Sequence, residues 1–358
     1  MKVGIINPIM CSSNIKGLFK YKRLHIKTDN YFSSVMLKKA LQKYADVKLV
    51  SSDFYKPEIK SKNVIYGKTK YYLSPIVAPI FDFNLDNCDK IIAVDFLQPA
   101  TLKILKTKKI YIWQDLNHYP RFPGKQIFFF LKRLKRYNNV IKFIPKTNAA
   151  KEFLIKNGFK NIGNIISGGV DTNLFKFQKT ESKFILSVGR LIKEKGHHIL
   201  IKAMQGLNIR LVIVGDGPEK LNLIKLSKKL NVNVEFLSSI NKHKLCSLYN
   251  KSYFTVFPSI KGETFGFVVL ESFACKKTVI TTDIPGPKDI ITSNTGIIVK
   301  PNDVYSLHKA IIKLFKNEKL RKQLENNAYK HVKKYYDWNI VAKSLIKEIS
   351  SDCNSDNS

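Results

Sequence analysis

Acidic residues are scarce in this chain. Its 358 residues include 62 Lys and Arg but only 27 Asp and Glu, which gives a formal net charge of +35. Residues 1–180 hold 33 basic and 11 acidic residues, against 29 and 16 in residues 181–358, so the excess is larger in the first half. Such a charge favours anionic partners such as phosphates, acidic lipid headgroups or nucleic acids. The alternative is codon bias, because Lys, Ile and Asn are abundant throughout, and both explanations stay open.

Long apolar runs and clustered cysteines are also missing. No run approaches the ~20 apolar residues that a membrane-spanning helix needs. The apolar run at the N-terminus ends at Pro8, which is too early for the core of a signal peptide. The five cysteines are far apart and lack the spacing of zinc ligands or of a disulfide framework. We therefore expect a soluble or peripheral protein of the cytoplasm.

Short β-rich runs alternate with helical patterns along the chain. One series of expected strands comprises residues 3–6, 47–50, 90–94, 109–113 and 141–144, and a second comprises 184–188, 210–214, 233–236, 254–257, 278–281 and 296–299. Apolar strands separated by helices are typical of parallel sheets that are covered on both faces. A polar bridge at 172–183 separates the two series. The sequence thus predicts two doubly wound α/β domains that hold a ligand in the cleft between them.

The most informative stretch is Glu263-Thr264-Phe265-Gly266-Phe267-Val268-Val269-Leu270-Glu271. Its two carboxylates lie eight positions apart around a strand-like apolar run, and a glycine precedes that run. A carboxylate that accepts hydrogen bonds from two vicinal hydroxyls makes charge-assisted interactions, and free amides at the start of a helix bind anions. The stretch therefore suits a ligand that carries both hydroxyls and an anionic group.

A second stretch follows the first strand of the second series and opens a helix. It contains Arg190 and Lys195. Arginine binds phosphate oxygens bidentately, whereas lysine acts as a point charge, so the two resemble a clamp for a departing diphosphate. The neighbouring Lys193, His197 and His198 are expected to face solvent.

These stretches, together with the turn Gly215-Asp216-Gly217-Pro218-Glu219, resemble in order and spacing the family-4 retaining glycosyltransferases (glycosyl transferases group 1). The resemblance covers residues 140–349 well and the first 140 in outline. It implies the GT-B fold, in which two Rossmann-like domains face each other across a cleft. It also implies transfer of a hexose or similar sugar, with retention of configuration, from a UDP- or GDP-linked donor to a glycan, lipid-linked or other acceptor.

The mechanism usually proposed for this family is a front-face reaction in which the leaving phosphate takes the acceptor proton. The protein then contributes positioning and charge stabilisation, and no side-chain nucleophile or cofactor is needed. The sequence contains no Asp-x-Asp motif, which argues for a reaction without a metal ion.

The resemblance assigns the site residues by position. The catalytic candidates are Arg190, Lys195 and Glu263, and the donor-binding candidates are Gly189, Gly215, Gly217, Leu237, Thr264, Phe265, Gly266, Phe267 and Glu271. In relatives, the first carboxylate region meets hydroxyls of the donor sugar, the second carboxylate binds the ribose hydroxyls, and the amides at 265–267 reach the phosphate. Backbone groups at 234–238 hold the nucleobase, and Ser238 stands where relatives often have glycine.

The acceptor side departs from the family pattern. Many relatives place a histidine near the reacting sugar, at the position where this chain has Gln114. His118, four residues further on, is the alternative candidate, although it also fits an ordinary surface histidine. The loop after the first strand is glycine-rich in relatives, whereas here it contains only Gly17. The acceptor therefore stays unknown.

The resemblance also sets the expected domains. Residues 1–171 form the acceptor-side domain and residues 172–335 the donor-binding domain. Residues 336–349 form a last helix that crosses back onto the first domain, and the polar tail 350–358 is expected to be disordered.

A basic amphipathic pattern lies in residues 125–137. Read as a helix, this segment places apolar side chains on one face and Lys125, Lys132, Arg133 and Arg136 on the other. Such a helix suits an anionic membrane surface, where each basic side chain contributes on the order of 1 kcal/mol. A core-facing helix with a solvated basic back is the alternative, and both interpretations stay open.

Two other classes of protein fit part of the pattern. A sugar-nucleotide 2-epimerase shares the overall architecture but differs in its motifs. A nucleic-acid-binding protein driven by charge would fit the net charge of +35. However, the sequence has no helix-turn-helix, zinc-finger or aromatic ribonucleoprotein signature, so no specific nucleic acid is expected as a partner.

Overall fold

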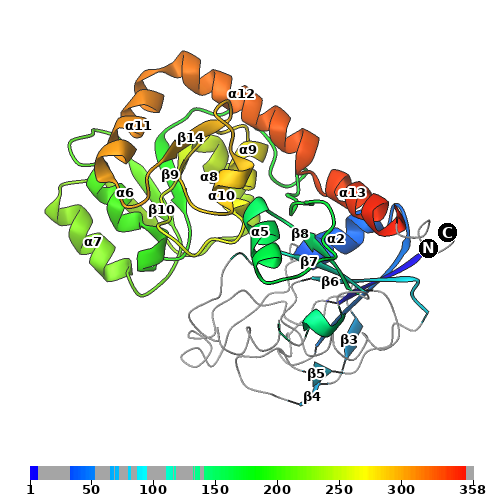
Figure 1. Ribbon diagram of the computed structural model, residues 1–358. Helices are drawn as coiled ribbons and strands as arrows, with labels where there is room; N and C mark the ends of the chain where they lie inside the picture. Colours follow the sequence, from blue (N-terminus) through cyan, green and yellow to red (C-terminus); the bar gives the residue numbers. More distant parts are fainter. Residues whose placement is uncertain are drawn as a thin grey trace. The chain divides into compact units, whose positions relative to one another are not determined.

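The structure is a computed structural model that describes residues 1–6, 33–52, 65–67, 69–71, 80–81, 87–94, 110–115, 117, 132, 134–137 and 141–351 (Figure 1). The chain divides into two compact units. The first unit comprises Met1–Ser167 and Trp338–Ser358, and the second comprises Gly168–Asp337. The chain thus builds the second unit without interruption and then returns to the first.

The first unit contains a six-stranded parallel sheet in the order β3-β2-β1-β6-β7-β8. Its strands are β1 Lys2–Ile6, β2 Asp46–Ser52, β3 Ile65–Gly67, β6 Lys90–Val94, β7 Ile110–Gln114 and β8 Ile141–Pro145. A separate antiparallel pair is formed by β4 Thr69–Tyr71 and β5 Ile80–Phe81. The described helical elements of this unit are α2 Ser33–Leu41, η1 Lys135–Tyr137, α5 Asn148–Lys156 and α13 Trp338–Ser350.

Helices α2 and α13 pack together over this sheet. Their shared core includes Ile5, Leu37 and Leu345, all fully buried. Trp113, at the end of β7, makes an edge contact with Trp338 at a ring separation of 6.2 Å. The last helix therefore completes the core of the first unit, although it follows the second unit in sequence.

The second unit repeats this topology with the order β11-β10-β9-β12-β13-β14, and all six strands are parallel. Its strands are β9 Phe184–Val188, β10 Leu211–Val214, β11 Val234–Leu237, β12 Ser252–Phe257, β13 Val279–Thr282 and β14 Gly296–Val299. Its helices are η2 Lys193–Lys195, α6 His197–Ala203, α7 Lys220–Lys229, α8 Lys242–Lys251, α9 Phe267–Ala274, α10 Pro287–Ile290, α11 Val304–Lys316 and α12 Glu318–Tyr335.

Helices cover both faces of this second sheet (Figure 1). Along β9, Phe184 and Leu186 enter the core that the sheet forms with α8, α9 and part of α12. Ile185, between them, enters the opposite core with α6 and α11. Because both faces are buried, the inner strands of this sheet lack the polar alternation of a half-exposed sheet, whereas the edge strand β11 carries Glu235, whose side chain is 41% exposed.

The strands expected from the sequence are all present, with ends displaced by no more than two residues. The expectation of a strand-like run between Glu263 and Glu271 is wrong, because the run from Phe267 onward forms helix α9. This helix packs against β12, β13 and α12, and all its residues from Val269 onward are buried. A buried helix and a buried strand have the same apolar composition in a run this short. The expected disordered tail starts at residue 350, but Ser350 ends α13 and the Ser351 hydroxyl donates to the Glu348 carbonyl at 2.8 Å. From residue 352 onward the tail lies outside the described residues.

Candidate active site

The strand order of the second sheet reverses at β9, which pairs with both β10 and β12. Doubly wound sheets bind ligands outside the carboxyl ends of their strands at such a switch point. The loop after β9 carries Gly189, Arg190 and Lys195, and the loop after β12 carries Glu263. The fold therefore brings two separate sequence stretches to one edge of the sheet.

These two loops are in direct backbone contact. The Ile260 amide donates a hydrogen bond to the Glu194 carbonyl at 2.7 Å. Gly196 has a φ of 68°, and a Cβ at this position would overlap the carbonyl of Pro258. Glycine meets both demands, because it adopts left-handed backbone angles and allows close approach.

Lys195 and Glu263 form an ion pair between Nζ and Oε1. Ser259 Oγ donates to the same Oε1 at 2.8 Å. The two charged side chains are 16% and 11% exposed, and Lys195 Nζ lies 5.4 Å from the centre of the Phe257 ring. Because both charges are largely withdrawn from water, their interaction is screened less than that of a surface pair.

The turns after β9 and β10 also meet backbone to backbone. Gly189 donates its amide to the Val214 carbonyl at 3.0 Å. A Cβ at Gly215 would overlap the Gly189 carbonyl, and a Cβ at Gly217 would overlap the carbonyl of Leu191. The predicted glycines therefore hold these turns together. Arg190, at the same junction, is half-buried.

His197 lies in the interior beneath this loop, with only 1% of its surface exposed. Its Nδ1 is 3.3 Å from Ser187 Oγ. Burial, followed by the charge of Lys195, lowers the pKa of His197 to about 4. The imidazole is therefore neutral near pH 7.

The expectation that His197 faces solvent is wrong, and His198 is half-buried. The sequence did contain a signal for the burial of His197. In α6 it shares the spacing i, i+3, i+4 and i+7 with Leu200, Ile201 and Met204, all fully buried. That spacing is the apolar face of a helix. Lys193, in contrast, is exposed as expected.

Glu271 lies in the second turn of α9 and is only 6% exposed. Lys242, in the first turn of α8, contacts its Oε1 at 2.5 Å. Tyr249 OH donates to its Oε2 at 2.9 Å. Burial, followed by the charge of Glu271, raises the pKa of Tyr249, so the phenol stays protonated and donates. An ionised carboxylate has about four lone-pair sites, so these two partners leave room for ligand hydroxyls.

The start of α9 is built from the predicted residues Thr264, Phe265, Gly266 and Phe267. Phe265 is buried and its ring lies 4.9 Å from that of Phe267, which is 39% exposed. Gly286 packs so closely on the Phe265 backbone that a Cβ would lie 2.7 Å from the Phe265 carbonyl oxygen. The first amides of a helix have no intrahelical acceptor and carry partial positive charge. This end of α9 can therefore accept an anion.

Leu237 ends β11, next to the turn that follows β10. Its carbonyl accepts a hydrogen bond from the Gly215 amide at 2.9 Å. The Ser239 amide donates to Asp216 Oδ2 at 2.7 Å, and Lys220 Nζ donates to Ser238 Oγ at 3.1 Å. The segment predicted to hold a nucleobase is thus tied to the glycine turn.

The acceptor-side candidates lie in the first unit. Gln114 ends β7 and is 1% exposed, and its carbonyl accepts from the Lys146 amide at 2.7 Å. Gly17 and His118 lie outside the described residues, as does most of the basic segment 125–137. Within the described ranges, no three His, Cys, Asp or Glu side chains converge in a way that could hold a metal ion. Nor does any helix of those ranges combine the length and apolar character needed to cross a bilayer.

Comparison with known proteins identifies the class of the second unit. Residues 169–331, somewhat less than half of the chain, match the family model of glycosyl transferases group 1. The resemblance to glycosyl transferases group 1 that the sequence motifs suggested is therefore confirmed over these residues, whereas the assignment to the retaining family 4 stays a prediction.

Two curated relatives are similar over part of their length. An uncharacterised glycosyltransferase of Methanocaldococcus jannaschii is 31% identical over 55% of this chain and 56% of its own. A Campylobacter jejuni enzyme, named as an N-acetylgalactosaminyltransferase that acts on a diphospho-undecaprenol-linked sugar, is 33% identical over 47% of this chain and 46% of its own. The chain thus spans about half the length of these relatives.

Solved structures share the fold. Anabaena HepE in complex with UDP has a TM-score of 0.73 at 16% identity, covering 98% of this chain and 100% of its own. The same protein in complex with UDP-glucose has a TM-score of 0.69. The predicted GT-B fold, with two Rossmann-like α/β domains, is therefore confirmed.

Proposed function

We propose that this chain is a retaining glycosyltransferase that moves a sugar from a nucleotide diphosphate to a glycan or lipid-linked acceptor. The observation that carries the proposal is the Lys195–Glu263 ion pair at the switch point of the second sheet. It lies within the segment that matches the glycosyltransferase family.

The chemistry follows from the charges near the switch point. Lys195 and Arg190 would bind the donor diphosphate and stabilise the negative charge that develops on it as the glycosidic bond breaks. Glu263 would orient Lys195 and accept hydrogen bonds from hydroxyls of the donor sugar. The leaving phosphate would take the proton of the acceptor hydroxyl, so the protein itself supplies positioning and electrostatics.

The nucleoside would bind further along the same edge. Glu271 has lone pairs left for the ribose hydroxyls, and Tyr249 fixes its carboxylate from the interior. The glycines at 189, 215 and 217 would allow the backbone to approach the donor, and Leu237 would meet the base through its main chain. Thr264, Phe265, Gly266 and Phe267 would present the first amides of α9 to the phosphate.

Uridine diphosphate is the first donor nucleotide to test, because HepE was solved with UDP and with UDP-glucose. Acceptors that carry a lipid-linked sugar are suggested by the Campylobacter relative. We expect no metal requirement, because the sequence lacks an Asp-x-Asp motif.

The test is a thermal-shift screen of the full chain against UDP, GDP, ADP and their sugars, followed by transfer assays with the best donor. Stabilisation by one nucleoside diphosphate and a product with unchanged anomeric configuration are expected, in chelator as well as in buffer. Failure of every nucleotide to stabilise the protein would refute the proposal. Inversion of the anomeric centre would refute its stereochemistry alone.

A further inference from the structure

Two cysteines of the second unit lie side by side. Cys246 is in the middle of α8, and Cys275 ends α9. Their Sγ atoms are 3.8 Å apart. The two thiols belong to different helices that pack together in the same core.

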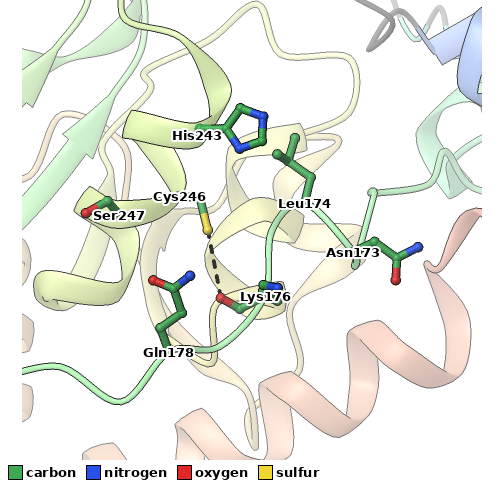
Figure 2. A pocket seen from close by; sticks show the side chains of 7 residues that line it. All are labelled: Asn173, Leu174, Lys176, Gln178, His243, Cys246 and Ser247. Carbon is green, nitrogen blue, oxygen red and sulfur yellow. Dashed lines mark hydrogen bonds between the residues drawn. The ribbon is translucent and has the colours of Figure 1, made fainter.

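A surface cavity leads to one of these sulfurs. It has a volume of about 170 Å³, and its lining includes Lys176, Gln178, His243, Cys246 and Ser247. Figure 2 shows the Cys246 sulfur directed at the Lys176 carbonyl, the two being 3.8 Å apart. One water occupies about 30 Å³ in the liquid, so a molecule of two heavy atoms such as hydrogen peroxide fits this cavity. Cys275 is fully buried behind Cys246 and does not line the cavity.

The surroundings of the two sulfurs give them different chemistry. Asn250 Nδ2 donates to Cys246 Sγ at 3.5 Å, and the Lys176 carbonyl and the Cys275 sulfur each lie 3.8 Å from it. The hydrogen bond with Cys275 lowers the pKa of Cys246 to about 6, although burial acts in the opposite direction. Burial raises the pKa of Cys275. The sulfur that lines the cavity therefore forms a thiolate at lower pH than its fully buried neighbour.

We infer that Cys246 and Cys275 form a thiol modification site that hydrogen peroxide converts to an intramolecular disulfide. The Cys246 thiolate attacks one peroxide oxygen, so that an S–O bond forms, the O–O bond breaks and hydroxide leaves. The Cys275 sulfur then attacks the sulfenic acid sulfur, so that the S–S bond forms and the S–O bond breaks. The proton of Cys275 leaves with the hydroxyl as water, and peroxide is the oxidant for both electrons.

The second step requires only a short movement. A disulfide bond is about 2.05 Å long, so the sulfurs must approach by roughly 1.8 Å from their present separation. Rotation of the two side chains and a small shift of α8 against α9 can supply this approach.

The test is peptide-resolved mass spectrometry of the full chain, reduced and then treated with peroxide. Trypsin separates the relevant cysteines into peptides 245–251, 262–276 and 71–90, the last of which contains the buried Cys88 of the first unit. We expect a cross-linked pair of the first two peptides that forms at least tenfold faster than any oxidation of Cys88. A cross-link from Cys246 to any other cysteine, or oxidation of Cys246 no faster than that of Cys88, would overturn the inference. This comparison uses the wild-type protein alone, so it does not depend on how a variant folds.

Two variants separate the roles of the sulfurs. Cys275→Ser should stop the reaction at the sulfenic acid of Cys246, which dimedone traps as a stable adduct. Cys246→Ser should leave Cys275 reduced, because peroxide reaches it only slowly, and Cys88→Ser should behave as wild type. Equal oxidation of Cys275 in the presence and absence of Cys246 would contradict the assignment. None of these readouts depends on glycosyl transfer, so the result is independent of the proposed function.

Discussion

Two lysine–glutamate pairs of the second unit are built in different ways. The Lys195–Glu263 pair joins the loops after β9 and β12, and both of its side chains are largely enclosed, at 16% and 11% exposure. In the Lys242–Glu271 pair the carboxylate is 8% exposed, but the lysine is 37% exposed. Glu271 accepts a hydrogen bond from the buried Tyr249 on the oxygen that Lys242 does not contact. Glu263 accepts one from Ser259 on the same oxygen that contacts Lys195. Lys195 is thus held in a largely enclosed position, whereas Lys242 contacts a carboxylate, Glu271, that Tyr249 already fixes.

The largest effect is expected from removing Lys195, the enclosed cation of the first pair. We expect Lys195→Ala to lower kcat by about 10²–10³, because fixed charges that act on a developing oxyanion contribute on this scale. Arg190→Ala should have a loss of the same order. Turnover is measured with a saturating nucleotide sugar, and circular dichroism checks that the variants are folded. The matched control is Lys193→Ala, two residues away and exposed, which should keep wild-type turnover. Near-normal turnover in Lys195→Ala or Arg190→Ala would refute the clamp.

The second prediction concerns the buried histidine under the first pair. Folded His197 has a pKa of about 4, whereas an unfolded histidine titrates near 6.5. Between about pH 6.5 and pH 4, His197 is protonated in the unfolded chain but neutral in the folded chain. The stability from this group is therefore complete above pH 6.5 and is lost as the pH falls toward 4, by about 2 kcal/mol between about pH 7 and pH 5.

Urea unfolding at these two pH values measures this loss. The variant His197→Gln should lose about 2 kcal/mol less than wild type over the same interval, whatever its absolute stability. The control His243→Gln, at an exposed position of α8, should keep the wild-type dependence. An equal loss in wild type and His197→Gln would contradict the burial of a neutral imidazole.

The sequence was sufficient to predict the two sheets, because strands buried on both faces are apolar along their whole length. The family resemblance assigned Lys195 and Glu263 to one donor site, and the structure shows that the loops carrying them are in contact. The sequence misassigned the segment after Gly266, where a buried helix has the composition of a strand. It could not show that Lys242 and Tyr249 hold Glu271, because those contacts depend on how α8 packs against α9 and not on any local pattern.

The third prediction tests the anchored carboxylate. Glu271→Gln should weaken binding of UDP about tenfold, because hydrogen bonds to a charged acceptor contribute about 1.5–3 kcal/mol. The same variant should bind UDP and its 2′,3′-dideoxy analogue with nearly equal affinity, whereas wild type should prefer UDP. Calorimetric titration measures both ligands. The control Glu181→Gln alters a carboxylate that is 79% exposed in a surface ion pair, and it should change neither affinity. A persistent preference for UDP in Glu271→Gln would mean that another group binds the ribose.

The smallest effect is expected at the exposed lysine of the second pair. Lys242→Met removes a partner of Glu271, but a pair with one exposed member contributes at most about 1 kcal/mol. Tyr249 still fixes the carboxylate, and the ribose hydroxyls can take the position that the ammonium leaves. The affinity for UDP should therefore change less than about threefold, as in the control Lys244→Met on the exposed side of the same helix. A loss as large as that of Lys195→Ala would instead make Lys242 a third cation for the diphosphate, and the two pairs would then have the same role.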